Sequence, residues 1–135
     1  MPKRPGFFQH LWRLGWAPVG VLVLHFVLAA LFGHRRELDP VFHFLGGAAG
    51  AYFLLRMLDG YPERLPRAWA RNGSRTIVFA MIGVALLWEL AEFGSDRVLG
   101  SHIQQGPLDT WSDVALGAAG AVAAVWVETV RARRR

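Results

Sequence analysis

The sequence contains no cysteine. This absence excludes disulfides, thiolate metal ligands and thiol catalysis, so any metal site must use oxygen and imidazole donors. Acidic residues are also few, with 10 Asp and Glu against 15 Lys and Arg. A basic balance can indicate nucleic-acid binding, but here the apolar residues lie in long runs that are unusual in soluble nucleic-acid-binding proteins. We therefore expect no nucleic-acid partner.

The apolar runs predict four membrane spans, at about 16–33, 40–58, 75–94 and 111–130. A bilayer core of about 30 Å requires roughly 20 mainly apolar helical residues. A soluble four-helix bundle would need a polar face on each helix, and the first and last runs have almost none. The predicted fold class is therefore all-α, an integral membrane four-helix bundle that forms a single transmembrane domain over residues 1–135, with the lipid bilayer as its partner.

Basic residues are distributed unevenly between the two ends of the predicted spans. Twelve of the Lys and Arg lie in the N-terminus, the second connection and the C-terminal tail, whereas three lie in the first and third loops. Cytoplasmic loops carry the excess of Lys and Arg. We therefore expect a multi-pass protein of the bacterial inner (cytoplasmic) membrane with both termini in the cytoplasm.

One segment occurs twice. Residues 38–51 read LDPVFHFLGGAAGA and residues 108–121 read LDTWSDVALGAAGA, so seven of fourteen positions are identical. Both copies carry small residues at a helical spacing that lets membrane helices approach closely. The prediction is a duplicated two-helix hairpin, in which the second and fourth spans run parallel and pack through glycines. These are Gly47, Gly50, Gly117 and Gly120, with Gly46 and Gly50 forming an additional GxxxG pair.

The ionisable residues near the outer ends of three spans form stripes at helical spacing. Asp39 and His43 are four residues apart, as are Asp109 and Asp113. Glu89, Glu92 and Asp96 follow at i, i+3 and i+7 in the third span. Such groups are costly near hydrocarbon and normally face the interior of the bundle.

We expect four of these residues, His43, Glu89, Glu92 and Asp113, to bind one divalent metal (Zn, Mn or Mg), with Glu89 and Glu92 also as the catalytic pair. Asp39 and Asp109 are expected to be helix N-caps or groups that support the metal ligands, and Thr110 with Asp113 matches a capping box. Arg97 is a candidate cation for Glu89 or Glu92.

The segments WELAEFGSDRVLG (88–100) and QQGPLDTWSDVALGAAGA (104–121) resemble the YjdF-like bacterial inner-membrane proteins, a family with no established activity. The resemblance covers about residues 38–121 and implies that the polar residues form a site. It adds Asp96, Gln104, Gln105 and Asp109 around the metal ligands or at helix ends. Gly117 departs from the pattern, since such proteins tend to have Asn there. A looser likeness to VanZ-like membrane proteins lacks an expected Arg between Gln and Asp.

Three functions remain open from the sequence. The first is a metal-dependent enzyme acting on a lipid-linked or cell-envelope substrate. The second is a small proton- or cation-coupled transporter or channel component, for which four spans are few and a homo-oligomer would be expected. The third is a non-catalytic membrane scaffold in which the polar cluster only fixes helix packing.

Overall fold

The computed structural model describes residues 6–33, 37–64, 67, 69, 72–104 and 106–134. Four long helices make up this part of the chain: α1 (Phe7–Phe32), α2 (Asp39–Gly60), α4 (Gly73–Leu99) and α5 (Pro107–Arg133). A short 3-10 helix, η1 (Pro62–Arg64), follows α2. All four long helices are long and apolar enough to cross a membrane. The predicted all-α membrane four-helix bundle is confirmed, and every long helix has more residues than its predicted span because helical backbone continues past the apolar run.

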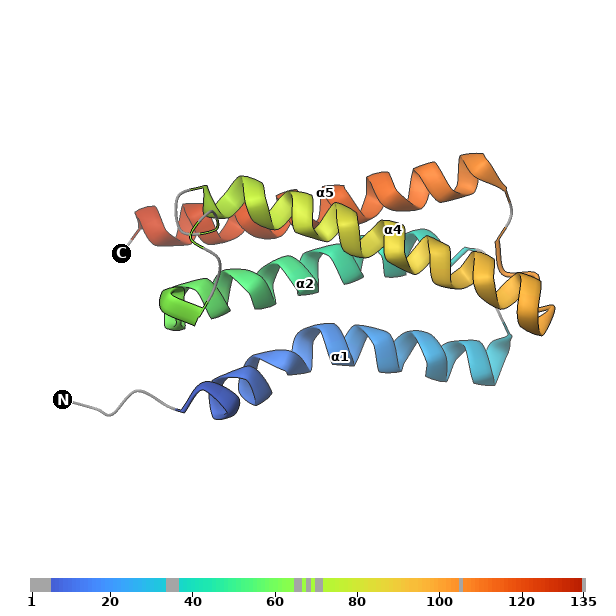
Figure 1. The fold of residues 1–135 in the computed structure, drawn as a ribbon, viewed down its shortest axis with the longest axis horizontal. Helices are drawn as coiled ribbons and strands as arrows, with labels where there is room; N and C mark the ends of the chain where they lie inside the picture. The colour runs from blue at the N-terminus through green and yellow to red at the C-terminus, as the bar shows by residue number, and fades with distance from the viewer. Residues whose placement is uncertain are drawn as a thin grey trace.

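The helices are arranged as two hairpins (Figure 1). Helices α1 and α4 run in one direction, α2 and α5 run in the other, and both chain termini lie at the same end of the bundle. Helix α2 packs most extensively against α5 and also contacts α1 and α4, whereas α4 contacts both α5 and α2. The arrangement agrees with a duplicated hairpin, but α1 is peripheral and α4 is not, so the two halves have different surroundings.

Glycines of the duplicated segment bring α2 and α5 into backbone contact. A Cβ atom added to Gly47 would collide with the carbonyl of Gly117. A Cβ atom added to Gly120 would collide with the carbonyl of Phe44 and lie 2.9 Å from the backbone nitrogen of Ala48. Backbone atoms cannot move aside as a flexible side chain can, so both positions require glycine.

The predicted Gly46–Gly50 pair is not part of this α2–α5 contact. Nothing lies within 4 Å of a Cβ added to Gly46, and one added to Gly50 meets the Met81 side chain of α4. The copies of the duplicated segment therefore pack through Gly47, Gly117 and Gly120. The physical reason is helix rotation: Gly46 and Gly47 are 100° apart around α2, and only Gly47 faces α5.

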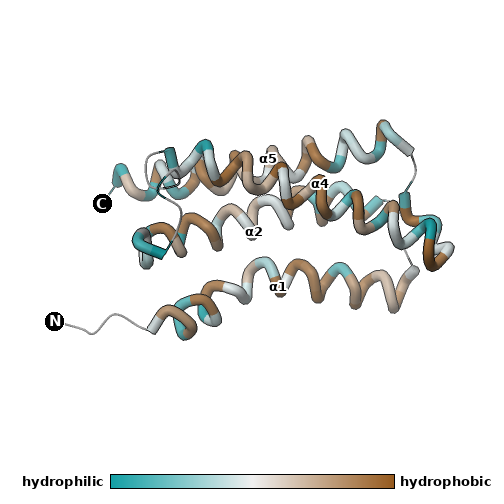
Figure 2. The backbone as a smooth tube through the Cα atoms, in the orientation of Figure 1, coloured by the Kyte–Doolittle hydropathy of each residue, from teal (hydrophilic) through white to brown (hydrophobic). Residues whose placement is uncertain are grey.

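The packed core is small and lies among α2, α4 and α5. Ala51, Ile77, Met81 and Ala121 are buried together, and α1 has no buried residue. Large apolar side chains instead cover the outside of the bundle, as expected for a surface that faces lipid. Figure 2 shows the central parts of the helices as mainly apolar and the helix ends as more polar.

The predicted helix caps are wrong. Helix α2 has Leu38 at its N-cap, and Asp39 is already inside the helix, followed by Pro40. Helix α5 has Gly106 at its N-cap and Pro107 as its first residue. Neither helix has a side-chain cap hydrogen bond, so the capping box of Thr110 and Asp113 is absent as well. In α5, Pro107 starts the helix before Asp109 because its fixed φ angle is already helical, and in α2 the backbone is already helical at Leu38, before Asp39.

Candidate metal centre

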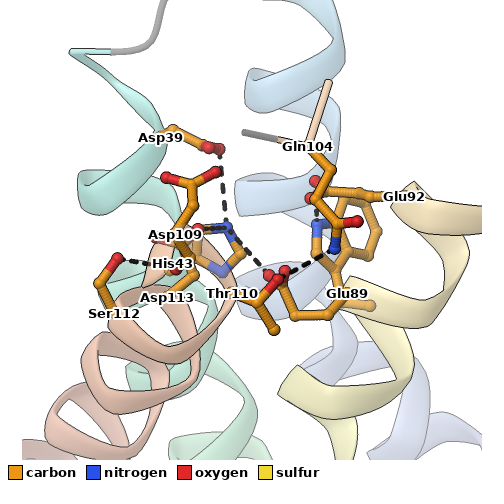
Figure 3. Close-up of polar contacts among 10 residues, drawn as sticks. Asp39, His43, Glu89, Glu92, Gln104, Asp109, Thr110, Ser112 and Asp113 are labelled. Atoms are coloured by element: carbon orange, nitrogen blue, oxygen red, sulfur yellow. Dashed lines mark hydrogen bonds and ion pairs between the residues drawn. The ribbon is translucent and has the colours of Figure 1, made fainter. Parts of the chain in front are cut away.

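The cluster is built around the imidazole of His43, on the first turns of α2. Its Nε2 atom lies 3.6 Å from Oδ1 of Asp39, 3.8 Å from Oε1 of Glu89 and 3.7 Å from Oδ2 of Asp113. These carboxylates come from α2, α4 and α5 in turn, so three helices contribute a side chain to the surroundings of His43. Figure 3 shows the imidazole ring between the α2 and α5 carboxylates on one side and Glu89 on the other. The site lies at the end of the bundle opposite the chain termini (Figure 1).

Glu92 extends the cluster along α4. Ligand atoms of His43, Glu89 and Glu92 all lie within 4.8 Å of one another, as do those of Asp39, His43 and Asp113. The indole N–H of Trp88 donates a 2.7 Å hydrogen bond to Oε1 of Glu92. This bond fixes one carboxylate oxygen and leaves the other available.

The four carboxylates are buried. The exposed fractions are 6% for Asp39, 4% for Glu89, 7% for Glu92 and 2% for Asp113. Like charges at this spacing repel strongly when removed from water, so the group requires protons or a cation. In the described part of the chain, Glu89, Glu92 and Asp113 form no ion pair with Lys or Arg. The Oε1 atom of Glu89 is buried and makes no hydrogen bond there.

Arg97 does not supply the expected cation. Its guanidinium lies over the Phe93 ring, 5.2 Å from the ring centroid. The suggested pairing of Arg97 with Glu89 or Glu92 is therefore wrong, because Arg97 lies near the end of α4 and folds back over the aromatic ring one turn earlier. The cluster keeps a large excess of carboxylate over cationic groups.

The spacing of the donors resembles that of metal ligands. Ligands at 2.0–2.1 Å from a tetrahedral metal are separated by about 3.3–3.4 Å, whereas neighbouring ligands of an octahedral metal at the same distance are separated by about 2.9 Å. The observed 3.6–3.8 Å from His43 to each carboxylate oxygen is closer to the tetrahedral value. The ligand atoms fall into two groups that share His43, one with Asp39 and Asp113 and the other with Glu89 and Glu92.

Asp96 lies near the end of α4 and binds the turn that follows. Its carboxylate accepts hydrogen bonds from the Ser101 hydroxyl at 2.6 Å and from the backbone N–H groups of Ile103 and Gln104 at 2.7 and 2.8 Å. The backbone N–H of Gly100, which adopts a left-handed φ of 67°, donates to the Asp96 carbonyl. Asp96 thus organises the turn between α4 and α5, and so helps to set how α5 follows α4.

The remaining predicted residues lie in the turn before α5, in the first turn of α5, or outside the described residues. The Gln104 amide donates to the hydroxyl of Thr110 at 3.0 Å, which links the turn to the start of α5. The Asp109 carbonyl accepts from the Ser112 hydroxyl at 2.7 Å. Gln105 lies outside the described residues. The structure therefore places the four predicted metal ligands in two groups that share His43, and it places Asp96, Gln104 and Asp109 in the surrounding turn and helix start.

One contributor was missed by the sequence prediction, and one was given a lesser role. Asp39 was expected to cap α2 or to support the metal ligands, yet it lies as close to His43 as Glu89 and Asp113 do. Trp88 was not assigned a role, yet it holds Glu92. The i, i+4 spacing indicated the contact of Asp39 with His43, and the same spacing of Trp88 with Glu92 could have indicated the missed one.

Comparison with known proteins gives a family. No curated protein and no solved structure matches the chain. The family described as "Predicted membrane protein (DUF2238)" matches residues 8–134, which include the whole cluster and all four long helices apart from Phe7 at the start of α1. Because this match spans nearly the entire sequence, the protein belongs to that family of membrane proteins.

Proposed function

We propose that the cluster is a divalent-metal site and that the protein is a metal-dependent hydrolase of the bacterial inner membrane. The observation that carries the proposal is the position of the His43 imidazole at 3.6–3.8 Å from carboxylate oxygens on three different helices. Burial of all four carboxylates, and the lack of a hydrogen bond to Oε1 of Glu89 within the described part of the chain, support it.

In this proposal Asp39, His43, Glu89 and Asp113 are the ligands. One imidazole with several carboxylates suits Zn²⁺ or Mn²⁺. A divalent cation there would activate a bound water as a nucleophile near neutral pH. Glu92, with one oxygen held by the Trp88 indole, would accept the proton from that water. The four ligands would hold the metal, and Glu92 would be the base.

The uneven distribution of Lys and Arg supports an orientation with both termini in the cytoplasm. The cluster, at the opposite end of the bundle, would then face the cell envelope. A substrate would reach it from the outer leaflet or from the envelope rather than from the cytoplasm.

The test is the metal content of the full chain, purified in detergent without chelators and measured by elemental analysis. We expect about one Zn or Mn per chain in the wild type and in Glu92→Gln, and loss of the metal in His43→Ala and Glu89→Gln. His102→Ala is the matched control, since His102 is an exposed histidine near the same end. A folded wild-type protein that binds no added Zn²⁺ or Mn²⁺ would overturn the proposal and leave the proton-relay and scaffold functions.

A further inference from the structure

A hollow of about 140 Å³ runs from the cluster toward the middle of the bundle. Its polar end is formed by Asp39 and His43. Its remaining wall is almost entirely apolar and includes Pro18, Val21 and Leu22 of α1 with Met81 and Val84 of α4. A hollow with one polar end and an apolar body is suited to a molecule that has a polar group at one end and an apolar chain.

The hollow reaches the lipid-facing surface between α1 and α4. Leu22 and Val84, from opposite walls, are also exposed on the outside of the bundle, at 42% and 52%. Helix α1 packs mainly against α2 and makes few contacts with α4. Toward the cluster the same seam is closed, because the His25 ring makes edge contacts with Phe42 at 4.9 Å and with Trp88 at 5.9 Å. Access is therefore from the side, at the depth of hydrocarbon.

The volume of the hollow limits how much of a bound molecule it can enclose. An apolar cavity of about 150 Å³ accommodates benzene, so 140 Å³ takes a chain segment of about six carbons. A longer chain would continue through the seam between α1 and α4 into the bilayer. A small soluble molecule would have to cross hydrocarbon to reach this opening, whereas a bilayer lipid is already there.

We propose that the hollow seats the first carbons of an acyl chain of a bilayer lipid, with the neutral ester group of that lipid at His43. The placement of the ester at a metal rests on the function proposed above, whereas the seating of the chain does not. A bilayer lipid is then the substrate class of the proposed metal site.

The charge of the cluster selects a neutral group rather than a phosphate. A divalent cation offsets only two of the four carboxylate charges when all four are ionised. An anionic phosphate would meet the remaining negative charge in a medium of low dielectric, which is unfavourable. An ester carbonyl carries no net charge and can approach a metal as a weak ligand.

The experiment uses the full chain in lipid nanodiscs and two photoactivatable lipids, a diacylglycerol and a phosphatidic acid, each with a diazirine close to the acyl ester. Gly46→Leu puts a side chain into the hollow, since Gly46 lines the hollow and nothing lies within 4 Å of a Cβ there. Gly83→Leu is the matched control, because a Cβ at Gly83 also has open space. A second pair is Val21→Phe in the α1 wall and Val19→Phe on its exposed face.

We expect diacylglycerol to label the α1, α2 and α4 segments that line the hollow. Labelling should fall at least fivefold in Gly46→Leu and Val21→Phe and stay unchanged in Gly83→Leu and Val19→Phe, with wild-type metal content in all four. Equal labelling in the filled and control variants would overturn the seating of the chain. Stronger labelling by phosphatidic acid than by diacylglycerol would overturn the neutral ester. Specific labelling in a protein that binds no metal would overturn the metal proposal and retain the acyl-chain site.

Discussion

Replacing Glu89 by glutamine should have opposite effects on stability with and without a divalent metal. Glutamine keeps the shape of the side chain and removes its charge. In the metal-free protein the change removes repulsion from neighbouring buried carboxylates. In the metal-loaded protein it removes a ligand. Substitution of a residue with only a structural role would change the free energy of unfolding in the same direction with and without metal.

The magnitudes follow from the geometry. Ligand atoms of Glu89 and Glu92 lie within 4.8 Å of each other. Two full charges at that distance repel by roughly 3 kcal/mol at an effective dielectric constant near 20. Partial protonation relieves some of this repulsion, so Glu89→Gln should stabilise the metal-free protein by about 1–3 kcal/mol. Free metal at a thousandfold excess over its Kd stabilises the wild type by about 4.1 kcal/mol, and the variant should lose this stabilisation.

The assay is equilibrium unfolding of the purified protein in mixed detergent micelles by sodium dodecyl sulfate, followed by tryptophan fluorescence. Each variant is measured with EDTA and with saturating Zn²⁺. Glu128→Gln is the matched control, because Glu128 pairs with Arg56 at 2.8 Å and with Arg131 at 3.0 Å at the other end of the bundle. Its effect should be the same in both conditions.

Two results would refute the reasoning. If Glu89→Gln destabilises the protein in EDTA, the buried carboxylates are not in repulsion and the charge argument fails. If Zn²⁺ does not stabilise the wild type at any concentration, the cluster does not bind this metal in the folded state, and Mn²⁺ must give the expected stabilisation for the metal proposal to survive.

Three further predictions concern packing, the turn and topology. Gly47→Ala should destabilise the bundle by about 1–3 kcal/mol in the same unfolding assay, because its Cβ meets the Gly117 backbone. Gly46→Ala should be neutral or stabilising by up to about 1 kcal/mol. Equal effects of the two substitutions would contradict the glycine contact. Asp96→Asn should speed hydrogen exchange at the amides of Ile103 and Gln104 and leave the metal content unchanged, and loss of the metal would place Asp96 in the site itself. Alkaline-phosphatase fusions after His102 should be active and fusions after Glu63 inactive, and the reverse would put the cluster on the cytoplasmic side.

The sequence by itself determined the fold class and most of the cluster. Runs of apolar residues longer than the bilayer core leave few alternatives to transmembrane helices, and the structure confirms four of them. Helical periodicity placed Glu89 and Glu92 on one face, and the duplicated segment placed His43 and Asp113 at equivalent depth. The likeness to the YjdF-like proteins stays a prediction, while membership in a family of membrane proteins is established.

The tertiary structure decided the contacts that depend on how helices rotate and tilt against each other. Both Gly46 and Gly47 fit a small-residue pattern, but only the orientation of α2 against α5 selects Gly47. Asp39 fits a helix cap in sequence, yet the helix begins at this residue and its side chain lies beside His43. The hollow between α1 and α4 has no sequence pattern at all, because it results from α1 packing on α2 while leaving most of α4 uncovered. Sequence periodicity reports the face of one helix, and only packing determines which faces meet.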